Sequence, residues 1–210
     1  MIPSASVPQT AQPLDWRLMK PDIADDAELL RAHIAGDPHA FARLYDRYDR
    51  QVFNYIRRML GVARADAAED LHQDVWLAIS RNAADFDPLK ANFAAWLFTI
   101  ARHKVWDYFR RQKVVLLTSG QSDEAMSVPD PGPTPEAQVE SRELAERLVT
   151  AVEALPLEQR GAFVMFAHGG LSLEEIAQAT GVAVETAKSR LRYARARLRQ
   201  ALAGERAAHV

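Results

Sequence analysis

The fold is decided by the stretch Leu171-Ser-Leu-Glu-Glu-Ile-Ala-Gln-Ala-Thr-Gly-Val-Ala-Val-Glu-Thr-Ala-Lys-Ser-Arg-Leu191, which predicts two helices joined by a sharp turn. Ser172 is a good N-cap residue, and Glu175 three positions later can complete a capping box. Gly181 supplies the turn, where a positive φ is often needed. A second helix is expected from about Val184 to Ala203. This is the pattern of a helix-turn-helix, whose second helix enters the major groove of DNA.

The predicted second helix is strongly basic. Between positions 182 and 203 there are six Lys or Arg residues and one acid, Glu185, so the local balance is six minus one, or +5. The alternative interpretation is an ordinary helical hairpin with a solvated basic face. Spacing, turn and charge coincide here, and together they favour DNA binding.

Bulk composition is that of a soluble globular protein, because 48% of the 210 residues are hydrophobic and 26% are charged. No apolar run approaches the length of a membrane span, and the N-terminus lacks the apolar core of a secretory signal, so a cytoplasmic location without membrane insertion is expected. The chain has no cysteine, and its six histidines form no ligand-spaced pair. We therefore expect no metal, no cofactor and no catalytic residue. The net charge of −2 argues against a uniformly basic nucleic-acid coat.

Hydrophobic periodicity predicts helices throughout and no strands, hence an all-α fold of two small helical domains joined by a flexible linker, the second domain ending in the helix-turn-helix. The linker has four prolines and four acids but no Lys or Arg, and its 25 residues reach on the order of 80 Å when stretched. We therefore expect the two domains to fold and tumble independently. The predicted segments are a disordered tail (1–24), a first domain (25–113), the linker (114–138), a second domain (139–203) and a short tail (204–210).

Acidic residues share one face of a helix predicted over positions 65–80. At 100° per residue its apolar stripe comprises Ala68, Leu71, Val75, Ala78 and Ile79, and the opposite side carries Asp66, Glu69, Asp70, Gln73 and Asp74. Such a face suits a partner rich in Arg or Lys. A merely solvated acidic face is the commoner meaning of such a run.

Aromatic and basic residues interleave on a helix predicted over positions 93–113, which follows a loop at 86–92. Its core stripe is Phe93, Leu97, Ile100, Ala101 and Tyr108, and the reverse side carries Trp96, Thr99, His103, Trp106 and Arg110. Exposed tryptophans are costly unless something covers them. Unstacked nucleic-acid bases need rings to stack on and cations for phosphate, whereas the alternative is that both tryptophans pack under another helix or domain. Lys104 is expected to point toward the apolar side, away from DNA.

Taken together, residues 25–203 resemble a bacterial RNA polymerase sigma factor of the sigma-70 family, of the extracytoplasmic-function (ECF) type with regions 2 and 4 only. The stretch 66–74 looks like region 2.2, which in this family docks on the β′ clamp helices of the polymerase. The stretch 96–111 looks like regions 2.3 and 2.4, which melt and read the −10 element, and the loop at 86–92 sits where the family captures a flipped base. The stretches 155–160 and 172–191 look like region 4, which reads the −35 element.

The resemblance implies three sets of binding residues. The −35 set is Ser172, Glu185, Thr186, Lys188, Ser189, Arg190, Arg192 and Tyr193. The −10 set is Asn92, Trp96, Arg102, His103, Trp106, Arg110 and Arg111. The polymerase-docking set is Asp66, Glu69, Asp70, Gln73 and Asp74. Three positions depart from the family pattern, since His103 stands where Asn is usual, Trp106 where an aliphatic residue is usual, and Ala187 where Val is more common.

The function implied by the resemblance is that of a transcription initiation factor, not an enzyme. Its implied partners are core RNA polymerase (β′ clamp helices and β flap), promoter DNA and an anti-sigma factor, which is the family's usual control. One alternative is a stand-alone repressor or activator, but that would need a dimer interface or a receiver domain, and the sequence suggests neither. A protein that only sequesters polymerase would leave the basic, tryptophan-bearing helix unexplained.

Overall fold

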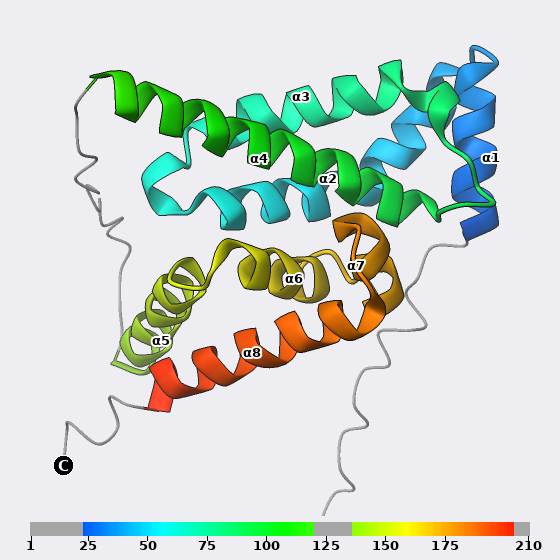
Figure 1. Cartoon of the computed structure of the whole chain (residues 1–210). Coiled ribbons are helices and arrows are strands. Elements are labelled where there is room, and N and C mark those ends of the chain that lie inside the picture. The colour runs from blue at the N-terminus through cyan, green and yellow to red at the C-terminus, as the bar shows by residue number, and fades with distance from the viewer. Residues whose placement is uncertain (1–22, 120–135, 204–210) are drawn as a thin grey trace, which may run out of the picture.

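The computed structural model describes the backbone of residues 23–119 and 136–203 and the side chains of residues 26–112 and 144–203. In these residues every regular element is helical, with eight α-helices and two short 3₁₀ turns (Figure 1). The predicted all-α fold is confirmed. Residues 1–22 and 204–210 of the predicted tails and residues 120–135 of the predicted linker lie outside the described residues. The last two residues of the predicted N-terminal tail, 23 and 24, are helical and begin the first helix. None of the described helices is long and apolar enough to cross a membrane.

The N-terminal half contains four helices: α1 (Ile23–Ile34), α2 (Pro38–Leu60), α3 (Ala67–Arg81) and α4 (Phe93–Ser119). The second of these, α2, begins at a proline whose predecessor, Asp37, accepts a hydrogen bond from the His39 amide, and it ends at Gly61, where φ is +82°. Fixed proline φ suits a first helical turn, and glycine tolerates the positive φ after the last one. These local signals set the length of the central helix.

The C-terminal half also contains four helices: α5 (Glu136–Glu153), α6 (Leu157–Ala167), α7 (Leu173–Thr180) and α8 (Val184–Ala203). The last two begin and end as the opening stretch predicts. The core of this half includes Ile176, Ala187 and Leu198, all buried. Small alanines at the crossing let the two helices of the helix-turn-helix approach closely.

The core of the N-terminal half lies between α2, α3 and α4. Val52, Tyr55 and Ile56 of α2 are fully buried, and the Tyr55 ring meets the Phe98 ring of α4 edge to face at 5.4 Å. On α3 the buried stripe includes His72 and Trp76 beyond the predicted residues. The reason is that Tyr45 of α2 covers the Trp76 ring, with 4.8 Å between centroids.

The boundaries of the linker differ from the prediction. Helix α4 continues to Ser119, six residues beyond position 113, and α5 begins at Glu136 rather than at 139. The run from Val114 to Ser119 contains neither proline nor glycine, so nothing in it terminates a helix. The segment between the two halves is therefore shorter than the composition suggested.

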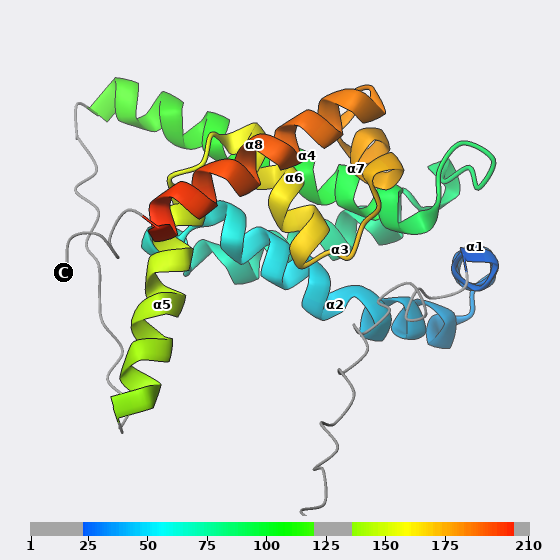
Figure 2. The same ribbon diagram turned by 90° about the horizontal axis from the view of Figure 1, so that it is seen from below.

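The two halves of the structure pack against each other, in contrast to the independent domains expected from the linker. Helix α7 contacts α4, and α6 and α5 contact α2 (Figures 1 and 2). The physical reason is that α4 is apolar on two sides. Ala95, Phe98 and Val105, all outside the predicted core stripe, are buried, whereas Ile100 and Tyr108 of that stripe are only half-buried.

Candidate nucleic-acid interface

The helix-turn-helix is fixed locally by its capping residues. Ser172 Oγ accepts a hydrogen bond from the Glu175 amide at 3.2 Å, and Glu175 Oε2 accepts one from the Ser172 amide at 2.5 Å. Gly181 is left-handed at φ +67° and ψ +36°, a conformation that glycine adopts without steric cost. Both predicted features are confirmed, and they set the angle at which α8 leaves α7.

The outer face of α8 is exposed near its N-terminus. The exposed members of the predicted −35 set there are Glu185, Thr186, Lys188, Arg192 and Tyr193. Lys188 is 3.3 Å from Glu185, and the Arg192 guanidinium lies 5.0 Å from the Tyr193 ring centre. Both are surface pairs that water and salt screen, so they hold these side chains only weakly. The N-terminal end of α8 is thus available for base edges and phosphates.

The three other members of the predicted −35 set are half-buried. Arg190 Nη1 is 2.9 Å from Glu158 Oε2 of α6, and the Arg190 side chain is only 22% exposed. Ser189 is half-buried, and Ser172 serves as the N-cap of α7. In this structure Arg190 ties α8 to α6.

The acidic face of α3 is exposed along its whole length. All five predicted docking residues, Asp66, Glu69, Asp70, Gln73 and Asp74, are exposed. Asp74 lies 3.8 Å from Lys104 of α4, so Lys104 is engaged on the α3 side, as expected of a residue pointing away from DNA. Helix α3 lies on the opposite side of the molecule from α8 (Figure 1). The acidic surface and the face of α8 can therefore be occupied together.

Behind the acidic face, His72 forms part of a buried cluster that the sequence pattern did not predict. Its Nε2 atom is 2.9 Å from Asp49 Oδ1 and 3.0 Å from Trp76 Nε1, which donates a hydrogen bond to it. Sequence periodicity missed these residues because a histidine and a tryptophan can lie on either side of an amphipathic helix.

The predicted −10 set divides into exposed and half-buried members. His103, Arg110 and Arg111 are exposed, and the half-buried members are Asn92, Trp96, Arg102 and Trp106. Desolvation by neighbouring groups, and next the nearby Arg102 charge, lower the pKa of His103 below its usual value. Arg102 lies 5.7 Å from the centre of the Trp106 ring.

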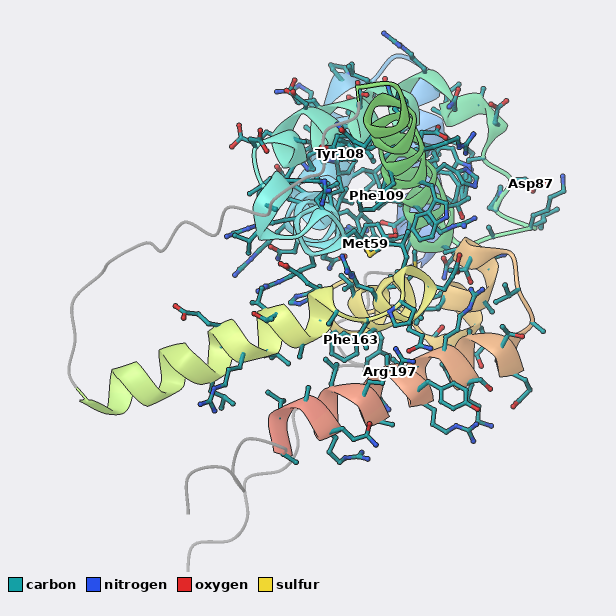
Figure 3. The ribbon with its side chains drawn as sticks, turned by 60° about the vertical axis from the view of Figure 1, so that its left-hand side comes forward. Met59, Asp87, Tyr108, Phe109, Phe163 and Arg197 are labelled. Atoms are coloured by element: carbon teal, nitrogen blue, oxygen red, sulfur yellow. The ribbon has the colours of Figure 1, made fainter. Side chains whose placement is uncertain are left out.

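The loop before α4 is an exposed turn. Leu89 is 95% exposed. The Asp87 carboxylate accepts a hydrogen bond from the Leu89 amide at 3.0 Å and forms an ion pair with Lys90 at 3.2 Å. The Leu89 amide and then Lys90 hold the pKa of Asp87 below its usual value. Figure 3 shows Asp87 projecting from the body of the molecule. The Trp96 ring beneath the loop packs on Phe86 at 5.4 Å.

Two residues of the −10 set bond to the helix-turn-helix. Arg102 Nε donates to the carbonyl of Ala179 at 3.0 Å, and the Asn92 side-chain amide donates to the Glu175 carboxylate. The Asn92 side-chain oxygen also caps α4 by accepting from the Ala95 amide at 2.7 Å. The sequence left open whether the reverse side of α4 faces DNA or another domain, and in this structure the Trp106 ring of that side lies next to Gly161 of α6.

Within the described residues, no group of three or more His, Asp or Glu side chains is arranged to hold a metal ion. What the described surfaces offer is charge and stacking area: a basic helix face, an acidic helix face and a partly covered helix with two tryptophans.

Comparison with known proteins identifies the family of the chain. Residues 44–114 match the family model for sigma-70 region 2, and residues 145–198 match the model for sigma-70 region 4. The chain is 37% identical over 177 residues to ECF RNA polymerase sigma factor SigM of Mycobacterium tuberculosis, covering 84% of each chain. It is 33% identical over 182 residues to ECF RNA polymerase sigma factor RpoE of Cereibacter sphaeroides, covering 86% of this chain and 97% of the relative. The chain belongs to the ECF sigma factors.

Solved sigma factors share the fold. The structure of CnrH in complex with the cytosolic domain of CnrY has a TM-score of 0.63 at 25% identity, over 85% of this chain and 97% of that one. The sigma factor RpoE of Bartonella quintana, in complex with the anti-sigma factor NepR, has a TM-score of 0.64 at 25% identity, over 77% and 96%. As an ECF sigma factor, this chain is a promoter-directing transcription initiation factor and not an enzyme, which confirms the resemblance noted from the sequence.

Proposed function

We propose that this ECF sigma factor reads the −35 element with the exposed face of α8 and binds the unwound −10 element with α4 and the loop before it. The observation that carries the proposal is the open N-terminal end of α8, which a capping box and a left-handed glycine hold at a fixed angle to α7. In a helix-turn-helix these are the positions that reach base edges in the major groove.

The −10 part of the proposal rests on α4. Trp96 and Trp106 offer rings, and Arg102, Arg110 and Arg111 offer cations along the same helix. Base stacking on an aromatic ring is worth about 1–3 kcal/mol per base. Because only unstacked bases can bind in this way, binding energy of that size favours the melted promoter over the duplex.

Core polymerase is the proposed partner of the acidic face of α3. Its five exposed residues include Asp70 and Asp74, and charge complementarity fits the β′ clamp helices that this region contacts in the family. The C-terminal half is proposed to contact the β flap, and the protein is proposed to act in the cytoplasm.

An anti-sigma factor is the proposed regulator. The structural relatives solved in complex with CnrY and with the anti-sigma factor NepR support this proposal of a regulator.

Run-off transcription tests the proposal. Core polymerase with this chain, supplied with a genomic promoter library, should initiate at sites that share one −35/−10 pair, whereas core polymerase alone should not. Initiation that is unaffected by the chain, or initiation at sites that share only one element, would contradict it.

A further inference from the structure

One ring nitrogen in the buried cluster behind the acidic face has two neighbours with opposite hydrogen-bonding needs. His72 Nε2 lies 3.0 Å from Trp76 Nε1, whose N–H can only donate. It also lies 2.9 Å from Asp49 Oδ1, a carboxylate oxygen that can only accept. An imidazole nitrogen carries either a proton or a free lone pair. At any moment, therefore, Nε2 bonds to one of these neighbours and leaves the other without a bond from His72.

Burial makes this choice consequential. Trp76 is 5% exposed and His72 is 8% exposed. Asp49 Oδ1 is buried and accepts no hydrogen bond in the arrangement in which Nε2 accepts from Trp76. The rings of Phe53 and Tyr45 meet the imidazole edge to face, at 5.6 and 6.1 Å between centroids. Because an unpaired buried polar atom costs more than an average hydrogen bond returns, the cluster has two distinct bonding states.

The ionisable groups around His72 come from α2, α3 and α4. From α2 come Asp49 and Tyr45, and the hydrogen bond to Asp49, with desolvation next, raises the pKa of Tyr45, so its hydroxyl is neutral. From α4, Lys104 pairs with Asp74 of α3 at 3.8 Å. The acids of α3 within three positions of His72 are all exposed, namely Glu69, Asp70 and Asp74. A positive charge on His72 would thus face Asp49 and lie behind the acidic face.

A proton on the ring decides between the two states. A neutral ring with its proton on Nδ1 accepts from Trp76, whereas an imidazolium has a proton on Nε2 and can only donate, which favours Asp49. Histidine is the side chain whose charge ordinarily changes near neutral pH. The Trp76 ring packs on Tyr45 at 4.8 Å and on Phe41 at 5.8 Å, between α2 and α3, which lie side by side (Figure 1). Loss of its acceptor therefore acts on the contact between these helices.

From this geometry we propose that His72 is a positioning residue for polymerase docking: its neutral ring holds Trp76 and so the docking helix α3, and its protonation releases Trp76 and places a positive charge behind the acidic face. This inference rests on the proposed function of that face. The sign follows from charge, because a cation among the exposed acids reduces their attraction for Arg and Lys of a partner. Docking therefore weakens as the pH falls.

The bond to Trp76 is measured by NMR on the full chain. The chain has four tryptophans, so Trp76→Phe identifies the Trp76 indole N–H resonance. This resonance should move in the original chain as the pH is lowered from about 8 to about 5.5. It should stay in place in His72→Gln, whose amide does not titrate and can accept from Trp76 and donate to Asp49 at once. A resonance that stays in place in the original chain, or that moves equally in His72→Gln, would overturn the two bonding states.

The consequence for docking is measured as affinity for core polymerase at pH 7.5 and pH 6.0, at one ionic strength. The original chain should lose about three- to tenfold more affinity on acidification than His72→Gln, the order expected of one added charge near an interface. Since polymerase itself titrates, the result is the difference between variants. His39→Gln removes an exposed histidine of α2 and is the matched control, which should respond like the original chain. Equal responses of the original chain and His72→Gln would overturn the effect on docking.

A second variant guards against misfolding of His72→Gln. Asp49→Asn keeps the shape of a side chain that is 37% exposed, and its amide can accept from Nε2 or donate to it, so it fits both states of the ring. The pH responses of the Trp76 resonance and of docking should both shrink, and unchanged responses in this variant would contradict the role of Asp49.

Asp70→Lys with Asp74→Lys separates this inference from the proposed function. Normal polymerase binding by that variant would refute docking through the acidic face and with it the effect of His72 on docking. The NMR titration would still decide whether His72 has two bonding states.

Discussion

Helices α8 and α4 both carry basic and aromatic residues on a side that the sequence predicts to face DNA, yet the structure treats them differently. On α8 that side is open, and Lys188, Arg192 and Tyr193 are exposed. On α4 it is partly covered, and Arg102 is bonded to Ala179. This difference in exposure follows from how many sides of each helix are buried. Helix α8 has one apolar side, buried on α6 and α7, whereas α4 buries residues on two sides.

The comparison teaches that a face of charge and rings does not by itself indicate exposure. A helix with one apolar stripe must present its other side to water or to a ligand. A helix with small or apolar residues on two sides is free to bury both, and then its polar residues bond to the covering element.

The largest expected effect concerns the acidic face of α3. Changing it tests whether polymerase binding can be lost while DNA binding through α8 is kept. Asp70→Lys with Asp74→Lys reverses two exposed charges on α3 and also breaks the ion pair with Lys104. Close charge pairs across interfaces couple by several kcal/mol, so core-polymerase binding should fall at least about a hundredfold, while duplex binding through α8 stays unchanged. Glu28→Lys with Asp46→Lys is the control of equal charge change, measured by the same polymerase titration. A similar loss in the control would show that net charge, rather than this face, governs docking.

The next effect measures how much of α4 is covered. The sequence placed Trp106 on the reverse side of α4, but its ring is half-buried, with Arg102 over one side and Gly161 of α6 nearby. Because full burial of an aromatic ring is worth about 3–5 kcal/mol on truncation to alanine, the half-buried ring should cost about 2 kcal/mol. Thermal unfolding should therefore show a Tm several degrees lower for Trp106→Ala than for His103→Ala, whose side chain is exposed. Equal melting temperatures would mean that α4 is not covered in solution.

Smaller effects distinguish the roles of Lys188 and Arg190, the two basic residues at the start of α8. Lys188→Ala should weaken binding to a −35 duplex by about 1–3 kcal/mol if Lys188 contacts a base, and by less if it contacts a phosphate. The Tm should not change, because the Lys188 side chain is exposed. Arg190→Ala should lower Tm slightly, since it breaks the pair with Glu158, a partly exposed pair worth about 1 kcal/mol or less. In a Glu158→Ala background the Tm effect of Arg190→Ala should vanish. Duplex binding and calorimetry on the four variants decide this.

The smallest effect concerns pH and the boundary between the halves. Desolvation by neighbouring groups, and next the Arg58 charge of α2, lower the pKa of His168 at the end of α6. A depressed folded-state pKa means that the unfolded chain binds more protons as pH falls through the usual histidine value near 6.5, so stability is lost on that side. Tm should fall slightly between pH 7.5 and pH 5.5, and His168→Gln should reduce the fall. A Tm that rises on acidification would contradict the assigned direction.

What the sequence predicted well is what local chemistry decides. The ends of α7 and α8 follow from Ser172, Glu175 and Gly181, whose roles depend only on neighbours along the chain. The acidic face of α3 follows from helical periodicity alone. The family assignment follows from the order of these motifs, and the comparisons confirm it.

What the sequence did not predict depends on distant partners. The residues that cover α4 are far away in sequence: Ala179 is 77 residues from Arg102, and Glu175 is 83 from Asn92. No periodicity reports a contact of that kind, and the acidic, proline-rich segment suggested separation. Burial of Trp76 likewise depends on Tyr45 of another helix. Gly169 is a retrospective signal, because a Cβ at this position would lie 2.9 Å from the Phe98 ring of α4, and glycine permits that close approach.

The proposal that α8 recognises duplex DNA and α4 binds the melted strand is tested most directly by one transcription measurement on two templates. Holoenzymes containing the original chain, Trp106→Ala or Lys188→Ala transcribe a promoter in duplex form and in a form with a pre-melted −10 bubble, at a temperature where all three chains are folded. Loss of a stacked base costs about 1–3 kcal/mol of open-promoter stability, so the bubble should restore most of the Trp106→Ala defect and none of the Lys188→Ala defect. A bubble that rescues both variants equally, or neither, would contradict the assignment of melting to α4 and of duplex recognition to α8.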